Sequence, residues 1–185
     1  NLDLEEMNIN HEKGRTFDSD IEKNKWASKN EKLSDGLKQI IDELNNQSFL
    51  ENLYNLSHIK NLFSTTEGNT ALANYHEMYK SGFLGTHVDH SSEPNTGLPH
   101  VLNIILYLSK KWDKSWGGST ILANHKGTKI EKLVDFVPNR AVIFLHSPFT
   151  FHGVTEIKNN LNKRSTVYVD YYSENLNPYK HLNLS

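Results

Sequence analysis

The chain has 185 residues, 36% of them hydrophobic and 23% charged, with a formal net charge of -2. This balance is that of a soluble globular domain and lacks the basic excess of a general nucleic-acid binder. The absence of cysteine excludes disulfides, iron–sulfur clusters, thiolate metal sites and a cysteine nucleophile. Any metal must therefore be held by nitrogen and oxygen donors, and the ten histidines are the main source of these.

Membrane and secretion signals are not evident in the sequence. No apolar run approaches the roughly 18 residues that a transmembrane helix needs. The first twenty residues are polar and contain no apolar core of a signal peptide. We therefore expect a cytoplasmic protein that binds neither membranes nor nucleic acid.

The N-terminal part of the chain divides into two stretches. Residues 1–30 are polar and predict an extension, whereas residues 31–185 predict a single domain whose first part, 31–69, forms supporting helices. Ser48 and Glu51 have the spacing of a capping box at the start of a second helix. The stripe of the first helix consists of Leu33, Leu37, Ile40, Ile41 and Leu44.

From about residue 70 to 175 the pattern changes to short strands bounded by turn-forming residues. The expected strands are Ala71–Met78, Gly85–Asp89, Val101–Leu108, Gly118–Ala123, Lys129–Val137, Ala141–Leu145, Phe151–Ile157 and Ser165–Tyr172. Strands that follow helices, rather than alternate with them, favour a mainly β fold with N-terminal helices, a β-sandwich or a barrel.

A pair of possible metal ligands lies in the segment around His87 and Asp89. Residues two apart on a strand point to the same face, so this imidazole and carboxylate project together. Two histidines and one carboxylate form the facial triad of non-haem Fe(II) oxygenases. Alone, such a pair is equally compatible with two polar residues on an exposed strand.

The best third ligand is His152, which begins a short strand and is followed by Gly153, where another group can approach closely. His146 is the alternative in the same segment. Because it ends an apolar strand, we expect it to be buried with a single hydrogen bond instead.

The ordered set of these motifs resembles the 2-oxoglutarate/Fe(II)-dependent oxygenase superfamily, and especially its prolyl-hydroxylase-like branch. The set consists of His87-x-Asp89, His152-Gly-Val and a late-strand Arg164-x-Thr166. The segments 104–119 and 136–144 are similar to that branch as well. The resemblance implies a double-stranded β-helix (jelly-roll) core over about residues 70–175.

The resemblance also implies a binding site for 2-oxoglutarate as cosubstrate. Arg164 matches the basic residue that pairs with its distal carboxylate, and a guanidinium suits this task because its planar fork binds a carboxylate bidentately. Alternation along the strand puts Thr166 on the same face and Lys163, the alternative anchor, on the opposite face. The insert 158–162 makes the spacing from His152 longer than is commonest in the family.

Two further residues are candidates for cosubstrate binding. Tyr75 lies where prolyl-hydroxylase-like members often place a tyrosine that donates to the cosubstrate, and a half-buried strand aromatic is the alternative interpretation. Asn103 is polar in an otherwise apolar strand, and a buried amide needs hydrogen-bond partners. Facing the cosubstrate is one way to find them, and a backbone hydrogen bond is the other.

The implied activity is a dioxygenase reaction with Fe(II), 2-oxoglutarate and O2, which hydroxylates a C–H bond of a peptide prolyl residue or of a small metabolite. The carboxylate of Asp89 favours hydroxylation over halogenation, because related halogenases lack it. The alternative is a cupin-like metalloprotein, an isomerase or a cosubstrate-free dioxygenase, which needs neither Arg164 nor 2-oxoglutarate. A third alternative is a non-catalytic binding module with a degenerate site.

Overall fold

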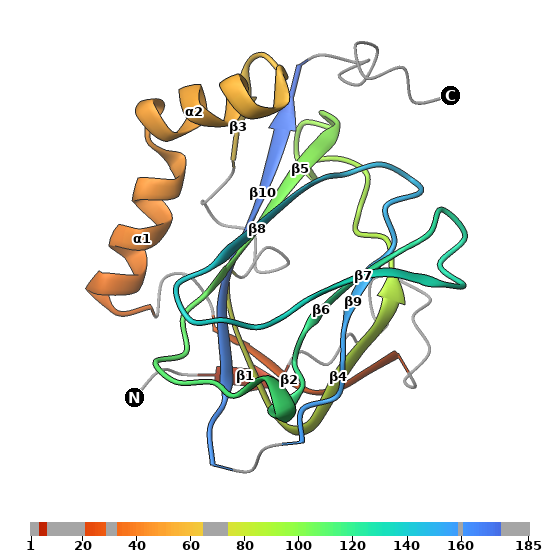
Figure 1. Ribbon diagram of the computed structural model, residues 1–185. Helices are drawn as coiled ribbons and strands as arrows, with labels where there is room; N and C mark the ends of the chain where they lie inside the picture. The colour runs from red at the N-terminus through yellow and green to blue at the C-terminus, as the bar shows by residue number, and fades with distance from the viewer. Residues whose placement is uncertain (1–3, 7–20, 29–32, 65–73, 159–160, 175–185) are drawn as a thin grey trace.

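A computed structural model describes residues 4–6, 21–28, 33–64, 74–158 and 161–174 (Figure 1). In chain order the elements are β1 (Leu4–Glu6), β2 (Glu22–Ser28), α1 (Asp35–Asn45), α2 (Gln47–Ser57), β3 (Leu62–Phe63), β4 (Tyr75–His87), β5 (His100–Tyr107), a 3-10 helix (Lys114–Trp116), β6 (Thr120–Ala123), β7 (Ile130–Val134), β8 (Ala141–Leu145), β9 (His152–Val154) and β10 (Arg164–Ser173). None of the described helices is long and apolar enough to cross a membrane.

Strand β4 connects two layers of the antiparallel sheet, whose order is β7-β6-β9-β4-β10-β5-β8. The first half of β4 pairs with β10, where Met78 lies opposite Arg164, and the second half pairs with β9, where His87 lies opposite His152. Between the halves Ser81 has a φ of 63°, a conformation that bends the strand. The fold is mainly β, and the predicted double-stranded β-helix is confirmed.

The interior between the two layers holds polar as well as apolar side chains. Tyr107 of β5 contacts Thr120 of β6 through their hydroxyl groups, 2.6 Å apart. Phe144 of β8 packs on His152 of β9 with ring centroids 4.9 Å apart. Residues that alternate along each strand therefore meet across the interior, which is where a ligand would be enclosed.

The outer face of β10 and β5 is covered by α1 and α2 (Figure 1). The apolar stripe predicted for the first helix packs on this face, and the Tyr171 hydroxyl donates to the carbonyl oxygen of Leu44 at 2.6 Å. Helix α2 begins earlier than expected, because Asn46 is its N-cap and accepts from the Phe49 amide at 2.8 Å. The capping box predicted at Ser48 and Glu51 is therefore wrong.

The strand boundaries differ from the sequence prediction in two places. The expected strands 71–78 and 85–89 merge into one long strand, β4, which ends at His87, two residues before Asp89. Residues 71–73 lie outside the described residues. Residues 22–28, expected within a polar extension, form β2 and pair with β4. Charged residues in β2 hid this strand, because the half-buried edge of a sheet tolerates them.

The packing of α2 on the sheet predicts an asymmetry between two leucines of that helix. Leu53 is 1% exposed and belongs to the main core, whereas Leu56 is 72% exposed. Leu53→Ala should lower the free energy of unfolding by about 2–5 kcal/mol, whereas Leu56→Ala should change it by less than about 0.5 kcal/mol. Urea unfolding followed by circular dichroism measures both, and equal losses would contradict the docking of α2.

Candidate metal centre

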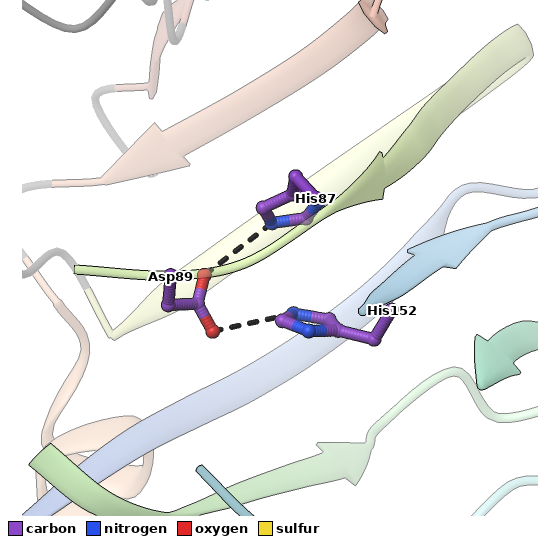
Figure 2. Close-up of side chains that lie close together, drawn as sticks. All are labelled: His87, Asp89 and His152. Atoms are coloured by element: carbon purple, nitrogen blue, oxygen red, sulfur yellow. Dashed lines mark ion pairs between the residues drawn. The ribbon is translucent and has the colours of Figure 1, made fainter. Parts of the chain in front are cut away.

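The side chains of His87, Asp89 and His152 converge where the second half of β4 meets β9 (Figure 2). His87 is the last residue of β4, and Asp89 follows two residues later. A Cβ on Gly153 would lie 2.5 Å from the carbonyl oxygen of Leu84. Only glycine lets β9 lie this close to β4, so Gly153 holds His152 opposite His87.

The carboxylate of Asp89 lies between the two imidazoles. Its Oδ1 is 3.3 Å from His87 Nε2, and its Oδ2 is 3.2 Å from His152 Nε2. Two donors bound to one ion at about 2.0–2.2 Å and at roughly right to tetrahedral angles are about 2.8–3.6 Å apart. The spacing of the three side chains therefore fits one shared metal ion.

Hydrogen bonds to the backbone orient both imidazoles. His87 Nδ1 lies 3.0 Å from the carbonyl oxygen of Gly85, and His152 Nδ1 lies 3.3 Å from that of Thr150. When Nδ1 carries the proton and donates it to these carbonyls, each Nε2 presents a lone pair to the site. This arrangement is typical of metal-ligating histidines.

The protonation states that the residues favour are those that metal binding requires. Burial lowers the pKa of His152 to about 4, so the ring is neutral near pH 7. Burial raises the pKa of Asp89, but the neighbouring His152 and His87 outweigh it and hold that pKa well below its ordinary value. The site thus combines the ionised Asp89 with the neutral imidazole of His152, and these are donors suited to a divalent cation.

Two interior residues position the Asp89 carboxylate. The Tyr168 hydroxyl donates to Asp89 Oδ2 at 2.9 Å, and Asn103 Nδ2 donates to the same oxygen at 3.2 Å. Burial and the nearby carboxylates of Asp170 and Asp89 raise the pKa of Tyr168, so its hydroxyl remains a donor. The sequence interpretation missed Tyr168, although alternation from Arg164 places it on the inner face.

His146, the alternative third ligand, does not join this group. It is buried, its Nδ1 lies 3.0 Å from the carbonyl oxygen of His100, and the two rings stack at 4.0 Å. Its Nε2 faces the backbone carbonyl of Asp89 at 3.4 Å rather than the carboxylate.

A buried guanidinium, that of Arg164, lies on the same inner face of β10, four residues before Tyr168 and roughly 13 Å along the strand. Arg164 is 4% exposed; its Nε donates to the carbonyl oxygen of Gly118 at 2.9 Å, and one terminal nitrogen reaches Thr120 Oγ1 at 3.4 Å. Burial lowers its pKa to about 10, which leaves it charged near pH 7.

None of the ion pairs within the described ranges involves Arg164. A buried charge is costly unless an opposite charge is paired with it, so this guanidinium is suited to a bound anion. Tyr107, whose ring centroid lies 5.4 Å from the guanidinium carbon, and Thr120 add hydroxyl groups beside it. Thr166, 2% exposed, pairs with Tyr107 across the strands on this inner face.

The positions of Tyr107 and Thr120 beside Arg164 were not predicted from the sequence. The available signal was alternation along β5, because Asn103, Ile105 and Tyr107 share one face of that strand. A tyrosine in an apolar run is ordinarily a core residue, so sequence alone gave no reason to place it beside Arg164.

The structure places Tyr75 and Lys163 away from this interior. Tyr75 belongs to the core on the helix-covered face, and its hydroxyl donates to Glu77 Oε1 at 2.5 Å. Lys163 forms an ion pair with the same buried Glu77. The prediction that Tyr75 faces the cosubstrate is therefore corrected, because strand alternation directs it to the opposite side of the sheet from Arg164.

Comparison with known proteins gives one family match. The family described as the 2OG-Fe(II) oxygenase superfamily matches residues 71–169. No curated protein sequence matches the chain.

Several solved structures are similar in fold. A prolyl-4-hydroxylase from Pseudomonas putida is 14% identical with a TM-score of 0.51, covering 77% of this chain and 67% of its own. The viral collagen prolyl hydroxylase vCPH from Paramecium Bursaria Chlorella virus-1, in a 2OG complex, is 14% identical with a TM-score of 0.52. The match covers 76% of this chain and 76% of that protein. HygX from Streptomyces hygroscopicus, with nickel, 2-oxoglutarate and hygromycin B bound, is 14% identical with a TM-score of 0.52. The match covers 86% of this chain and 74% of that protein.

A jelly-roll whose interior carries two histidines, an aspartate and an unpaired arginine defines the class of non-haem metal oxygenases. Because the family match extends over more than half of its length, the chain belongs to the 2OG-Fe(II) oxygenase superfamily. Its cofactors are Fe(II) and 2-oxoglutarate, with O2 as the oxidant. The match favours this family over the cupin-like alternative.

The close approach at Gly153 predicts a specific defect. In Gly153→Ala the new Cβ would meet backbone at 2.5 Å, whereas in Gly36→Ala it would meet nothing within 4 Å. Gly153→Ala should displace β9 and weaken Ni(II) binding, measured by titration calorimetry, at least about tenfold. Gly36→Ala should leave Ni(II) binding unchanged and raise stability by about 0.5–1 kcal/mol. Unchanged Ni(II) affinity in Gly153→Ala would show that the β4–β9 spacing does not position His152.

Proposed function

We propose that this chain hydroxylates a C–H bond of a peptide prolyl residue or a small metabolite, coupled to oxidative decarboxylation of 2-oxoglutarate. His87, Asp89 and His152 hold the Fe(II), and Arg164 anchors the 2-oxoglutarate. The observation that carries this proposal is the presence, inside one barrel, of a three-residue ligand group and of a buried guanidinium that has no carboxylate partner among the described residues.

The ligand group fits Fe(II) in number, charge and spacing. Its ligand atoms all lie within 4.8 Å of one another, and two imidazoles with one carboxylate leave coordination positions open for cosubstrate and O2. When bound, iron and 2-oxoglutarate supply the oxidising chemistry for an unactivated C–H bond. The protein supplies position, charge and exclusion of water.

Asp89 supplies the negative charge that partly neutralises the cation. Its orientation is fixed by Tyr168 and Asn103, both of which donate to Oδ2. A carboxylate held in this way keeps one orientation relative to His87 and His152. Asn103, which was predicted to face the cosubstrate or to bond the backbone, positions Asp89 instead.

Arg164 offers its guanidinium to the distal carboxylate of 2-oxoglutarate. The hydroxyl groups of Tyr107 and Thr120, together with Thr166 on the same face, surround that position with groups that can donate to an oxyanion. Charge-assisted hydrogen bonds in a buried site discriminate a dicarboxylate from neutral analogues. The ring centroid of Phe136 lies 4.9 Å from the guanidinium carbon. This ring excludes water and so strengthens the charge-assisted hydrogen bonds.

The proposed substrate classes rest on the similarities in fold. Two of the similar structures are prolyl hydroxylases, and a third, HygX, is described with hygromycin B bound. A fold supports many substrates, so this support concerns the class of reaction more than the molecule.

The first test is the visible charge-transfer band of anaerobic Fe(II)-loaded protein after addition of 2-oxoglutarate. The band should appear in the wild type and be lost in His152→Ala and Asp89→Ala, because each removes a proposed ligand. His125→Ala, at an exposed turn residue, is the matched control and should keep the band. Bound iron without a band in the wild type would overturn the proposal and return attention to the cupin-like alternative.

Arg164 should control affinity for 2-oxoglutarate and not for iron. Loss of a charge-assisted hydrogen bond in a buried site costs about 1.5–3 kcal/mol, so Arg164→Ala should raise the KM for 2-oxoglutarate about tenfold to a hundredfold. Fe(II) affinity should change little. Arg140→Ala, which removes an exposed arginine, should alter neither value. An unchanged KM in Arg164→Ala would show that another group binds the distal carboxylate.

A further inference from the structure

A second group of potential ligands lies behind Asp89, on the other side of Asn103. It consists of His90, His100 and Asp170 and shares no residue with the first group. We propose that these three residues bind a second divalent transition-metal ion, distinct from the ion held by His87, Asp89 and His152. Such a site goes beyond the proposed oxygenase function and does not depend on it.

The spacing of the donor atoms supports this second site. His100 Nε2 lies 3.1 Å from Asp170 Oδ1, and His90 Nε2 lies 3.6 Å from Asp170 Oδ2. The first distance is within the range of about 2.8–3.6 Å expected for two ligands of one ion, and the second lies at its upper end. All the ligand atoms of the group lie within 4.8 Å of one another.

The surroundings of His100 Nε2 give the strongest support for an ion bound by these three residues. Its side chain is 0% exposed, and its buried Nε2 makes no hydrogen bond. The nitrogen is close to Asp170, yet a ring N–H at that position would not point at the carboxylate. A simple His–Asp hydrogen bond would align the two groups, whereas ligands of one ion both point at the ion and not at each other.

The opposite ring nitrogen of His100 is already held. His100 Nδ1 lies 2.9 Å from the carbonyl oxygen of His90, so Nδ1 carries a proton and an ion would have to replace only the proton on Nε2. The ring also stacks on His146 at 4.0 Å, so its orientation is fixed. A histidine fixed in this tautomer and orientation is prepared for a metal rather than for solvent.

The other two ligands also have the supporting contacts of a metal site. Asp170 Oδ1 accepts from Asn103 Nδ2 at 2.9 Å, and ligating carboxylates are ordinarily hydrogen-bonded in this way. His90 Nε2 lies 2.8 Å from the Tyr172 hydroxyl, a hydrogen bond that an ion bound at this nitrogen would replace. Two imidazole nitrogens with carboxylate oxygen favour Zn(II), Co(II), Ni(II) or Fe(II) over Mg(II) or Ca(II).

Asn103 connects the two sites. Its Nδ2 lies 3.2 Å from Asp89 Oδ2 and 2.9 Å from Asp170 Oδ1, while its buried Oδ1 has no hydrogen-bond partner. The amide therefore separates two carboxylates that would repel each other if neither were neutralised. A divalent cation at either carboxylate reverses the charge of that site, so a second cation at the neighbouring site should bind more weakly than the first.

The test is the stoichiometry of Co(II) bound by metal-free protein, measured by equilibrium dialysis and followed by the Co(II) absorption spectrum. The wild type should bind about two equivalents. His152→Ala should bind about one, His100→Ala should bind about one, and the double variant should bind none. His125→Ala should bind as the wild type does. Addition of 2-oxoglutarate should change the spectrum of His100→Ala and not that of His152→Ala. This difference separates the two sites, and it distinguishes failure of the second metal site from failure of the proposed oxygenase function.

Saturation of the wild type at about one equivalent, with none bound by His152→Ala, would overturn the proposal and leave an ion pair between His100 and Asp170. A second equivalent that survives in His100→Ala would overturn it as well, because the ion would then lie elsewhere. If His100→Ala fails to fold, the stoichiometry of His152→Ala still decides the question.

Discussion

The structure depends on keeping the carboxylate of Asp89 ionised inside a protein interior. Burial alone would favour the neutral acid. His87 and His152 on one side, and the donors of Tyr168 and Asn103 on the other, reverse that preference. These contacts come from β4, β5, β9 and β10, so one charged group determines which strands must meet and how closely they must pack.

The bend in β4 is the geometric solution to that requirement. A flat strand would pair with the same neighbours along its length, and its ends would lie in one layer. Because β4 leaves β10 and joins β9 after Ser81, it delivers His87 from one layer to His152 of the other. Gly153 then permits the short distance between them. The buried guanidinium of Arg164 stays with the first layer, four residues before Tyr168 on β10.

The sequence predicted what alternation and an ordered motif can predict. The succession of short strands follows from the turn-forming residues between them. The predictions that His87 and Asp89 share one face and that Arg164 and Lys163 lie on opposite faces follow from the alternation of side chains along a strand. Tyr75 was misplaced because resemblance was preferred over the alternation that pairs it with Glu77. Tyr168, Asp170 and His100 were overlooked because their partners lie on distant strands, and only the register of β10 with β5 brings them together. Strand β2 was hidden because its charged residues lie at the sheet edge.

The position of β10 in the middle of the sheet has a consequence for biosynthesis. β10 pairs with β3, β4 and β5 and carries Arg164, Tyr168 and Asp170, yet it is the last described strand to leave the ribosome. Until then the first half of β4 pairs only with β2, and Asp89 lacks the Tyr168 donor. Iron capture must therefore follow completion of the chain through residue 173. A nascent chain therefore exposes His87 and Asp89 to metal ions before the fold can select among them.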